Sequence, residues 1–203
     1  MLTSPPLRAR RSGGFSLIEL MTVIALVCLL LLAAMPSFIT WTRNVKVHAA
    51  AVELQNALRA AQAEAVRRSR QVIFVRTTGS TASAAGLIPA DAGARWAIVT
   101  LPLLDDERAE VVEAGELIDT SAAQGFTVTG GPAALCFNSA GRLTARGDLP
   151  LVSGECAAPN GPISFTLDMS GADRPLKVTV APGGQVRLCD PSRAGKPEGC
   201  SAS

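Results

Sequence analysis

A run of apolar residues near the N-terminus is the most uneven feature of the chain. Residues 15–35 read FSLIELMTVIALVCLLLLAAM, and Glu19 is the one charged residue among them. As an α-helix, these 21 residues would span about 31 Å at ~1.5 Å per residue, which matches the ~30 Å hydrocarbon core of a bilayer. The pattern therefore predicts a transmembrane helix over residues 15–36.

The segment before this run, residues 1–14, is basic and is interrupted by proline and glycine. Its three cations lie on the N-terminal side of the apolar run: Arg8, Arg10 and Arg11. The positive-inside rule places that end in the cytoplasm and the rest of the chain beyond the membrane. A secretory signal peptide also begins basic and turns apolar. It is disfavoured because no good small-x-small cleavage site follows the run, whereas Gly13 and Gly14 precede it.

The helix is expected to continue beyond the membrane over residues 37–70. Between Lys46 and Arg70 the chain contains neither glycine nor proline and is rich in good helix formers. Small and apolar residues recur there at i, i+3, i+7, i+10 and i+14, which is one helical face: Ala51, Leu54, Leu58, Ala61 and Ala65. This face predicts a packed stripe along the helix.

Residues 71–203 show a different pattern, with short apolar and β-branched segments between clusters of glycine, proline, aspartate and serine. Such spacing favours antiparallel sheets over alternating βαβ units. Strands are predicted at Gln71–Thr77, Trp96–Leu101, Val111–Ile118, Phe126–Thr129, Ala134–Phe137, Ile163–Leu167, Leu176–Val180 and Gln185–Cys189. Residues 78–94, rich in glycine, alanine, serine and threonine, are expected to form an exposed loop or hairpin.

Composition and charge exclude several function classes. The 203 residues are 48% hydrophobic and 18% charged, which excludes a disordered chain of low hydrophobicity. Without the three arginines of residues 1–14, basic residues no longer outnumber the 17 acidic ones, so no global basic field recruits nucleic acid. His48 is the only histidine, and no nucleophile, phosphate-loop or metal-ligand motif is found, so neither catalysis nor a cofactor or metal is expected. The acidic residues 105–119 lack calcium-loop spacing and are interpreted as a solvated face.

The five cysteines fall into two groups. Cys28 lies in the apolar run, where a small buried thiol needs no partner. The other four form an even set in the part predicted outside the cytoplasm, where disulfides persist: Cys136, Cys156, Cys189 and Cys200. Three pairings are open, and sequence proximity favours Cys136–Cys156 with Cys189–Cys200. Zinc binding is the rival interpretation, but C-x₂-C spacing is lacking.

A carboxylate near the start of a membrane helix needs an explanation. By insertion scales such a group costs about 2.5–3.5 kcal/mol at mid-bilayer, and less near the interface. A position at headgroup level would make Glu19 a bystander. In a functional interpretation, cleavage after Gly14 exposes an ammonium on Phe15, and the ammonium of a neighbouring subunit pairs with Glu19 inside lipid. That pairing would set the axial register between subunits of an assembly.

Residues 14–20, GFSLIEL, resemble the class III signal of type IV pilins and type II secretion pseudopilins. The resemblance implies cleavage between Gly14 and Phe15 by a prepilin peptidase, which also methylates the Phe15 nitrogen. It further implies that Glu19 is the carboxylate used in filament assembly. Pro36, at the end of the apolar run, also matches pilins, in which a proline bends or loosens the helix.

Three further segments resemble the GspH/FimT branch of these proteins. Residues Ala61–Ala65 are similar to the end of the branch's helix, and Phe137–Arg142 is similar to its F-x-x-x-G-R turn. Residues Gly184–Pro191 are similar to its C-terminal G-R-x-R strand followed by Cys-Asp-Pro. In DNA-uptake members, arginines of that strand are implicated in DNA binding. This chain has Gln185 at the first arginine position and retains Arg187.

The sequence thus predicts an α+β, pilin-like fold, in which a long N-terminal transmembrane helix packs against a C-terminal antiparallel β-sheet domain. The expected organisation is a leader peptide at residues 1–14, the membrane helix at 15–36, its periplasmic continuation at 37–70, and a GspH/FimT-like β-rich domain at 71–203.

The resemblance implies a minor subunit of a type IV pilus-like filament, with a structural role in pilus biogenesis. Such a subunit sits in the cell inner membrane, with a cytoplasmic N-terminus and a periplasmic β-rich domain, before it enters a pilus or pseudopilus. Its expected partners are the prepilin peptidase and other minor pilins or pseudopilins. Two alternatives stay open: the H-type pseudopilin of a type II protein secretion system, and a minor pilin that takes up DNA and contacts it through Arg142 and Arg187.

Overall fold

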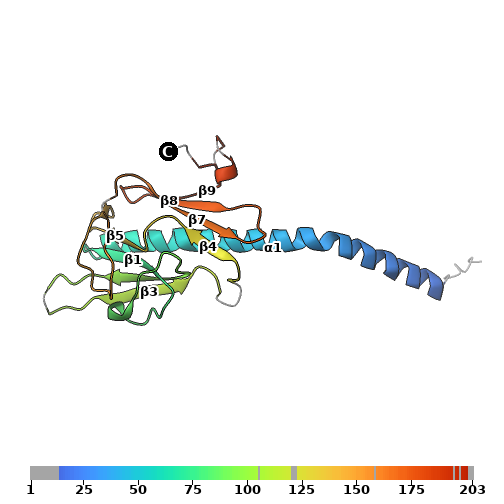
Figure 1. The fold of residues 1–203 in the computed structure, drawn as a ribbon, viewed down its shortest axis with the longest axis horizontal. Coiled ribbons are helices and arrows are strands. Elements are labelled where there is room, and N and C mark those ends of the chain that lie inside the picture. The colour runs from blue at the N-terminus through green and yellow to red at the C-terminus, as the bar shows by residue number, and fades with distance from the viewer. Residues whose placement is uncertain are drawn as a thin grey trace, which may run out of the picture. The chain divides into compact units, whose positions relative to one another are not determined.

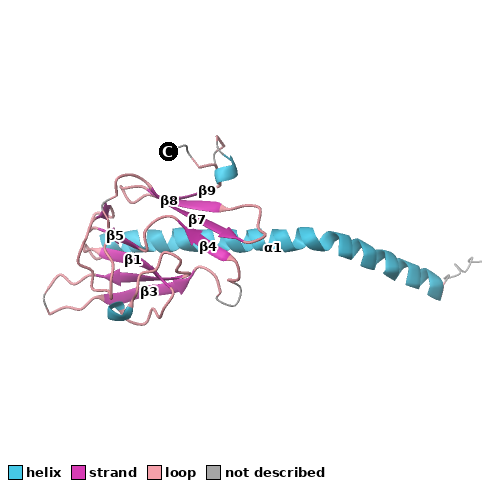
Figure 2. Ribbon diagram, viewed as in Figure 1, coloured by secondary structure: helices cyan, strands magenta, loops and turns pink. Residues whose placement is uncertain are grey.

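The computed structural model describes residues 14–104, 106–119, 123–157, 159–193, 195–196 and 198–200. The chain divides into two units, residues 1–39 and residues 40–203. Helix α1, Leu17–Arg67, contributes to both units, and every strand belongs to the second (Figure 2). The two units are described separately, and residues 40–203 are called the head.

In the first unit, α1 begins at Leu17, and the Leu20 N–H donates to the Ser16 carbonyl at 3.1 Å. All described residues up to Ile39 are exposed. The helix continues through Pro36. Since proline has no N–H, the carbonyl of Leu32 loses its usual helical donor at this point.

In the head, α1 buries one stripe of small and apolar side chains. The stripe consists of Val47, Ala50, Ala51, Leu54, Ala57, Leu58, Ala61 and Ala65. All five residues of the predicted face are among them, so this prediction is confirmed. The alanines leave room for strands to approach the helix closely, while the two leucines and Val47 fill the space between them.

The helix ends three residues before the predicted position. Ser69 has a φ of 52°, in the left-handed region, and the Arg70 N–H donates to the Ala65 carbonyl at 3.2 Å. This pattern satisfies carbonyls that would otherwise lack donors at the helix end. The chain turns there and enters the first strand.

Sheet A has the strand order β3-β2-β1-β5-β6, with every neighbouring pair antiparallel. Its strands are β1 (Val72–Thr77), β2 (Arg95–Thr100), β3 (Glu110–Glu116), β5 (Ala134–Phe137) and β6 (Leu143–Thr144). The register pairs Val72 with Thr100 in β2 and with Phe137 in β5. The short strand β6 was not predicted, because two residues are too few to show an alternating pattern.

Sheet B has the order β4-β7-β8-β9 and is also antiparallel throughout. Its strands are β4 (Phe126–Thr129), β7 (Ile163–Met169), β8 (Leu176–Val180) and β9 (Val186–Cys189). In Figure 1 the strands β7, β8 and β9 lie on one side of the head portion of α1, and β1 and β3 lie on the other.

Two hydrophobic cores follow from this arrangement. The larger contains the α1 stripe together with side chains from both sheets, including Phe74, Phe137 and Phe165. The smaller covers the opposite face of sheet A and includes Ile73, Val75, Ala84 and Leu87. Alternate residues of β1 therefore point into different cores. The prediction that residues 78–94 are an exposed loop is wrong for Ala84 and Leu87, which pack into the smaller core.

Two glycine turns join the sheets at one end of the head. Gly184, in the turn between β8 and β9, has a φ of +90°, and a Cβ on it would lie 1.9 Å from the Gly141 carbonyl oxygen. The Gln62 side chain donates to that same carbonyl at 3.0 Å. The Leu143 N–H donates to the Pro182 carbonyl at 3.0 Å. Helix α1, sheet A and sheet B thus meet at a point that admits no side chain.

We expect Gly184→Ala to lower the free energy of unfolding of the head by about 2–3 kcal/mol, because it combines a left-handed conformation with a steric clash. The matched control is Gly183→Ala, since a Cβ there meets no atom within 4 Å, and its effect should stay within about 0.5 kcal/mol. Denaturant unfolding followed by fluorescence of the buried Trp96 measures both. Equal effects of the two substitutions would contradict the packing described here.

Candidate functional site

The residues predicted for processing and assembly lie just before α1 and in its first turn. Phe15 is 84% exposed, and Glu19 is an exposed acidic residue in the first helical turn. A negative charge at a helix N-terminus is favoured by the helix dipole. The Thr22 hydroxyl donates to the main-chain carbonyl of Glu19 at 2.9 Å, and the Glu19 residue is exposed. Gly14 is the first described residue, and no atom of the described residues lies within 4 Å of where its Cβ would be.

The surface of α1 from Leu17 to Ile39 is almost entirely apolar and exposed. Its large side chains are exposed to between 45% and 74% from Leu17 onward. This helix is long and apolar enough to cross a membrane. So much exposed apolar surface is unfavourable in water and is normally covered by lipid or protein. The free Cys28 lies on this segment.

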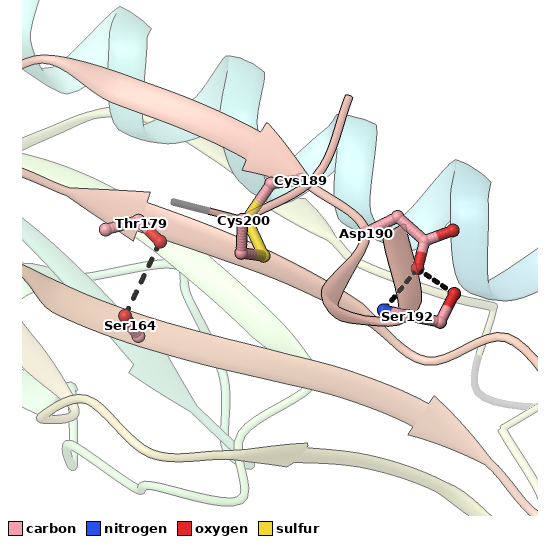
Figure 3. The surroundings of a disulfide bond; sticks show 6 residues. All are labelled: Ser164, Thr179, Cys189, Asp190, Ser192 and Cys200. Atoms are coloured by element: carbon pink, nitrogen blue, oxygen red, sulfur yellow. Dashed lines mark hydrogen bonds between the residues drawn. A yellow bond between two sulfur atoms is a disulfide. The ribbon is translucent and has the colours of Figure 1, made fainter. Parts of the chain in front are cut away.

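The four remaining cysteines form two disulfides. Cys136 pairs with Cys156, and Cys189 pairs with Cys200. The first bond joins β5 to a segment that covers the smaller core, where both cysteines are buried. The second closes the loop after β9 and joins two cysteines 11 positions apart in the sequence (Figure 3). Within the described residues, no group of three His, Cys, Asp or Glu side chains is placed to hold a metal ion.

Asp190 organises the loop that the second disulfide closes. Its Oδ1 accepts from the Ser192 N–H at 2.9 Å and from the Ser192 hydroxyl at 2.5 Å (Figure 3). The guanidinium of Arg193 lies 3.6 Å from Oδ2 and also donates to Glu198 at 2.6 Å. The Ser192 hydroxyl is the main reason that the pKa of Asp190 lies below its usual range, and Arg174 and Arg193 act in the same direction, while burial opposes them.

A groove of about 670 Å³ lies between the head portion of α1 and the end of sheet B. Trp41, Val45 and His48 line its helix side, and Arg174, Leu176 and Leu188 line its sheet side. The loop closed by Cys189–Cys200 forms one of its walls. The sequence alone did not indicate this groove, because its two sides are more than 120 residues apart.

The candidate DNA contacts occupy exposed positions near the junction of the two glycine turns. Arg142 directly follows Gly141, and Arg187 lies on β9 beyond Gly184. Other arginines that could extend a basic patch are engaged elsewhere. Arg146 donates to the Gln71 side chain at 2.7 Å and to the Asp148 carbonyl at 2.8 Å, and Arg193 binds Glu198.

Arg76 on β1 is a buried cation that the sequence pattern did not single out. Its side chain is inaccessible to solvent, and its guanidinium lies 5.0 Å from the centre of the Phe165 ring on sheet B. Within the described residues its three guanidinium nitrogens have no hydrogen-bond partner. Burial lowers the pKa of Arg76, and the nearby charge of Asp91 opposes this shift. The side chain links the two sheets through a cation–π contact.

The family model for type II transport protein GspH matches residues 50–184 of this chain. The chain belongs to the GspH family. A second model, the prokaryotic N-terminal methylation motif, matches residues 9–35, and this range contains Gly14, Phe15 and Glu19 of the GspH-family chain. No curated protein sequence gives a significant match.

Solved structures of pilin-like proteins resemble this GspH-family chain in fold. The type IV minor pilin FimU of Pseudomonas aeruginosa strain PAO1 is 18% identical, with a TM-score of 0.51 over 75% of this chain and 95% of that chain. The minor pseudopilin EpsH from the type 2 secretion system of Vibrio cholerae is 15% identical, with a TM-score of 0.41 over 70% of this chain and 95% of that one. The likeness to FimU confirms the predicted pilin-like α+β fold.

The lowered pKa of Asp190 predicts a pH-dependent contribution to stability. Because the pKa of Asp190 is lower in the folded state, this contribution is complete when the pH is above the pKa of the unfolded state, about 3.9. It is lost as the pH falls through the pKa of the folded state. We therefore expect Asp190→Asn to destabilise the head at pH 7 and to differ progressively less from the wild type below about pH 4. Thermal unfolding between pH 7 and pH 2 measures the difference.

Asp148→Asn is the control for this experiment, since Asp148 is an exposed carboxylate whose side chain lies outside the Asp190 loop. Its unfolding temperature should follow that of the wild type across the pH range. A difference between Asp190→Asn and the wild type that stays constant down to pH 2 would contradict the assigned role of Asp190.

Proposed function

We propose that this GspH-family protein is a minor subunit of a type IV pilus-like filament, anchored in the inner membrane with its head in the periplasm until it is assembled. The observation that carries the proposal is the combination of an N-terminal methylation motif over residues 9–35 with a GspH-family head over residues 50–184. The role is structural and requires no catalytic group.

The exposed surface of α1 supports a place in a helical filament core. In the isolated chain residues 17–39 are all exposed, including every large apolar side chain among them. Lipid covers such a surface in the membrane, and helices of neighbouring subunits cover it in a filament. Because both environments are apolar, moving the helix from lipid into a filament gains little hydrophobic free energy. Van der Waals packing and polar contacts therefore determine the free energy of association.

Glu19 supplies the polar contact in this proposal. A prepilin peptidase cleaves between Gly14 and Phe15 and methylates the new N-terminus, which carries a positive charge. Glu19 of one subunit pairs with the Phe15 ammonium of its neighbour, and in a low-dielectric core this attraction is much stronger than in water. The pair satisfies a carboxylate that is costly in an apolar environment, and it fixes the axial register of adjacent helices.

The H-type pseudopilin of a type II protein secretion system is the alternative. The family model matched over residues 50–184 is named for type II transport, and the FimU likeness comes from a type IV pilus. A pseudopilus and a pilus use the same helix-packing and charge-pairing chemistry. The two assignments therefore differ in the partner subunits and in what the filament does for the cell.

DNA binding is not part of the proposal. Arg142 and Arg187 are exposed, but Arg146 and Arg193 are held by contacts within the head, and Gln185 replaces an arginine of the DNA-binding strand motif. Since affinity for duplex DNA increases with each phosphate that a cation neutralises, two exposed arginines on a near-neutral head provide little of it.

A clean deletion scored in one strain for surface pili and for exoprotein secretion separates the two assignments. We expect loss of pili and of twitching motility with normal secretion. Retention of exoproteins in the periplasm with normal pili would identify a secretion pseudopilin instead. Complementation with the wild-type gene is the control, and a strain unaffected in both assays would contradict the proposal as a whole.

Glu19→Ala tests the assembly mechanism. Removal of an intramembrane carboxylate should leave membrane insertion intact, because the substitution makes the helix more apolar. Incorporation into sheared filaments should fall by about tenfold or more, since the buried pair is worth more than ~1.4 kcal/mol. Cys28→Ala, on the same apolar segment, is the matched control and should incorporate normally. Normal incorporation of Glu19→Ala, measured by immunoblot, would rule out the ammonium pairing.

A further inference from the structure

The groove beside α1 is lined by both apolar and charged side chains. The large apolar ones are Trp41, Val45, Leu176 and Leu188, and the charged ones, here called the rim, are Arg174, Asp190, Arg193 and Glu198. Trp41 and Val45 lie four residues apart, hence on one helical face, and are 60% and 48% exposed. Apolar side chains that line a concave site favour a ligand with an apolar portion.

One cation at the rim is available to an anionic ligand. The two acidic side chains of the rim already have partners, since Asp190 accepts from Ser192 and Glu198 accepts from Arg193. Arg174 is half exposed and forms a long ion pair with Asp190, whose Oδ2 lies 3.9 Å from its guanidinium. No hydrogen bond from its guanidinium is found within the described residues. Its planar N–H groups match the oxygens of a phosphate.

The helix holds the turn that carries Arg174. The Asn44 side chain donates to Asp173 Oδ1 at 2.5 Å and accepts from the Asp173 N–H at 3.1 Å. The Arg43 guanidinium lies directly against Gly171, where a Cβ would be 1.7 Å from its nitrogen. Because this turn is fixed to α1, Arg174 is oriented toward the groove before a ligand arrives, which lowers the entropic cost of binding.

The position of the groove along the chain indicates the source of the ligand. Trp41 follows Met35, the last residue of the apolar run, by six residues, which is at most ~9 Å of helix. The headgroup layer on each side of a bilayer is about 5–8 Å thick. When residues 15–35 fill the hydrocarbon core, Trp41 lies at the headgroup level, where tryptophan is enriched.

We infer that the groove binds the phosphodiester headgroup of a membrane phospholipid. Arg174 donates hydrogen bonds to the phosphate oxygens, while Trp41 contacts the glycerol. The inference rests on the proposed anchoring of residues 15–36 in the membrane. It gives the head a second attachment to the bilayer, which has to be released when the subunit enters a filament.

The test uses the full chain in dodecyl maltoside micelles, whose sugar headgroups contain no phosphate. Dihexanoyl phosphatidylglycerol is titrated while tryptophan emission is recorded. The chain has two tryptophans, and Trp96 is buried, so a Trp41→Phe variant identifies the reporter. We expect a saturable blue shift from Trp41, which dihexanoylglycerol, with the same acyl chains and no phosphate, does not produce.

Arg174→Gln should weaken this binding about tenfold or more, because it removes charge-assisted hydrogen bonds to the phosphate. The matched control is Arg108→Gln, an exposed arginine between β2 and β3 and outside the groove, which should bind as the wild type does. Equal affinities of the wild type and Arg174→Gln, the absence of saturation, or an equal response to dihexanoylglycerol would each overturn the inference.

Inorganic phosphate is titrated in the same way. A saturable shift of the Trp41 emission at similar concentrations of free phosphate would show that the groove binds a soluble anion and not a lipid, and would also overturn the inference. Membrane association is measured separately by resistance of the full chain to carbonate extraction. If the chain stays in membranes but shows no response to the lipid, only the inference of lipid binding in the groove is rejected. If carbonate releases the chain, the proposed anchoring is rejected.

Discussion

The buried stripe of α1 from Val47 to Ala65 is the surface around which the head is built. Phenylalanines of both sheets pack into the same core as this stripe. A sheet with one apolar face needs a second layer to cover it, and here a single helix supplies that layer for two sheets. The alanines of the stripe are as important as its leucines, because strands can approach closely only where side chains are small.

Contacts outside the core fix the sheets relative to this helix. Gln62 holds the Gly141 turn, and Arg59 donates to the Val186 carbonyl of β9 at 3.2 Å. At the other end of the stripe, Asn44 holds the turn after β7 through Asp173. These side chains belong to the polar positions that flank the stripe. The helix therefore helps to position the elements that form the groove and carry Arg142 and Arg187.

The same helix has no buried side chain in residues 17–39. Val47 and Leu54 are buried by other parts of the chain, whereas the leucines near Glu19 are exposed and need lipid or other subunits to cover them. Under the proposed function this difference suits the protein to assembly: the head folds around its part of α1, and the first unit leaves an apolar surface with one carboxylate for partners. Transfer from membrane to filament needs no refolding of the head under this proposal.

The sequence by itself determined the elements and the chemistry that depends on local order. The apolar run, the Glu19 carboxylate, the Ala51–Ala65 face and eight of the strands follow from periodicity and from short motifs, which are properties of neighbouring residues. The tertiary structure decided what depends on residues far apart in the chain. Three features depend on how distant segments pack against one another. They are the burial of Ala84 and Leu87, the pairing of β6, and the contact of Gly184 with Gly141. The groove arises in the same way, because Trp41 and Arg174 become neighbours only when sheet B packs on the helix.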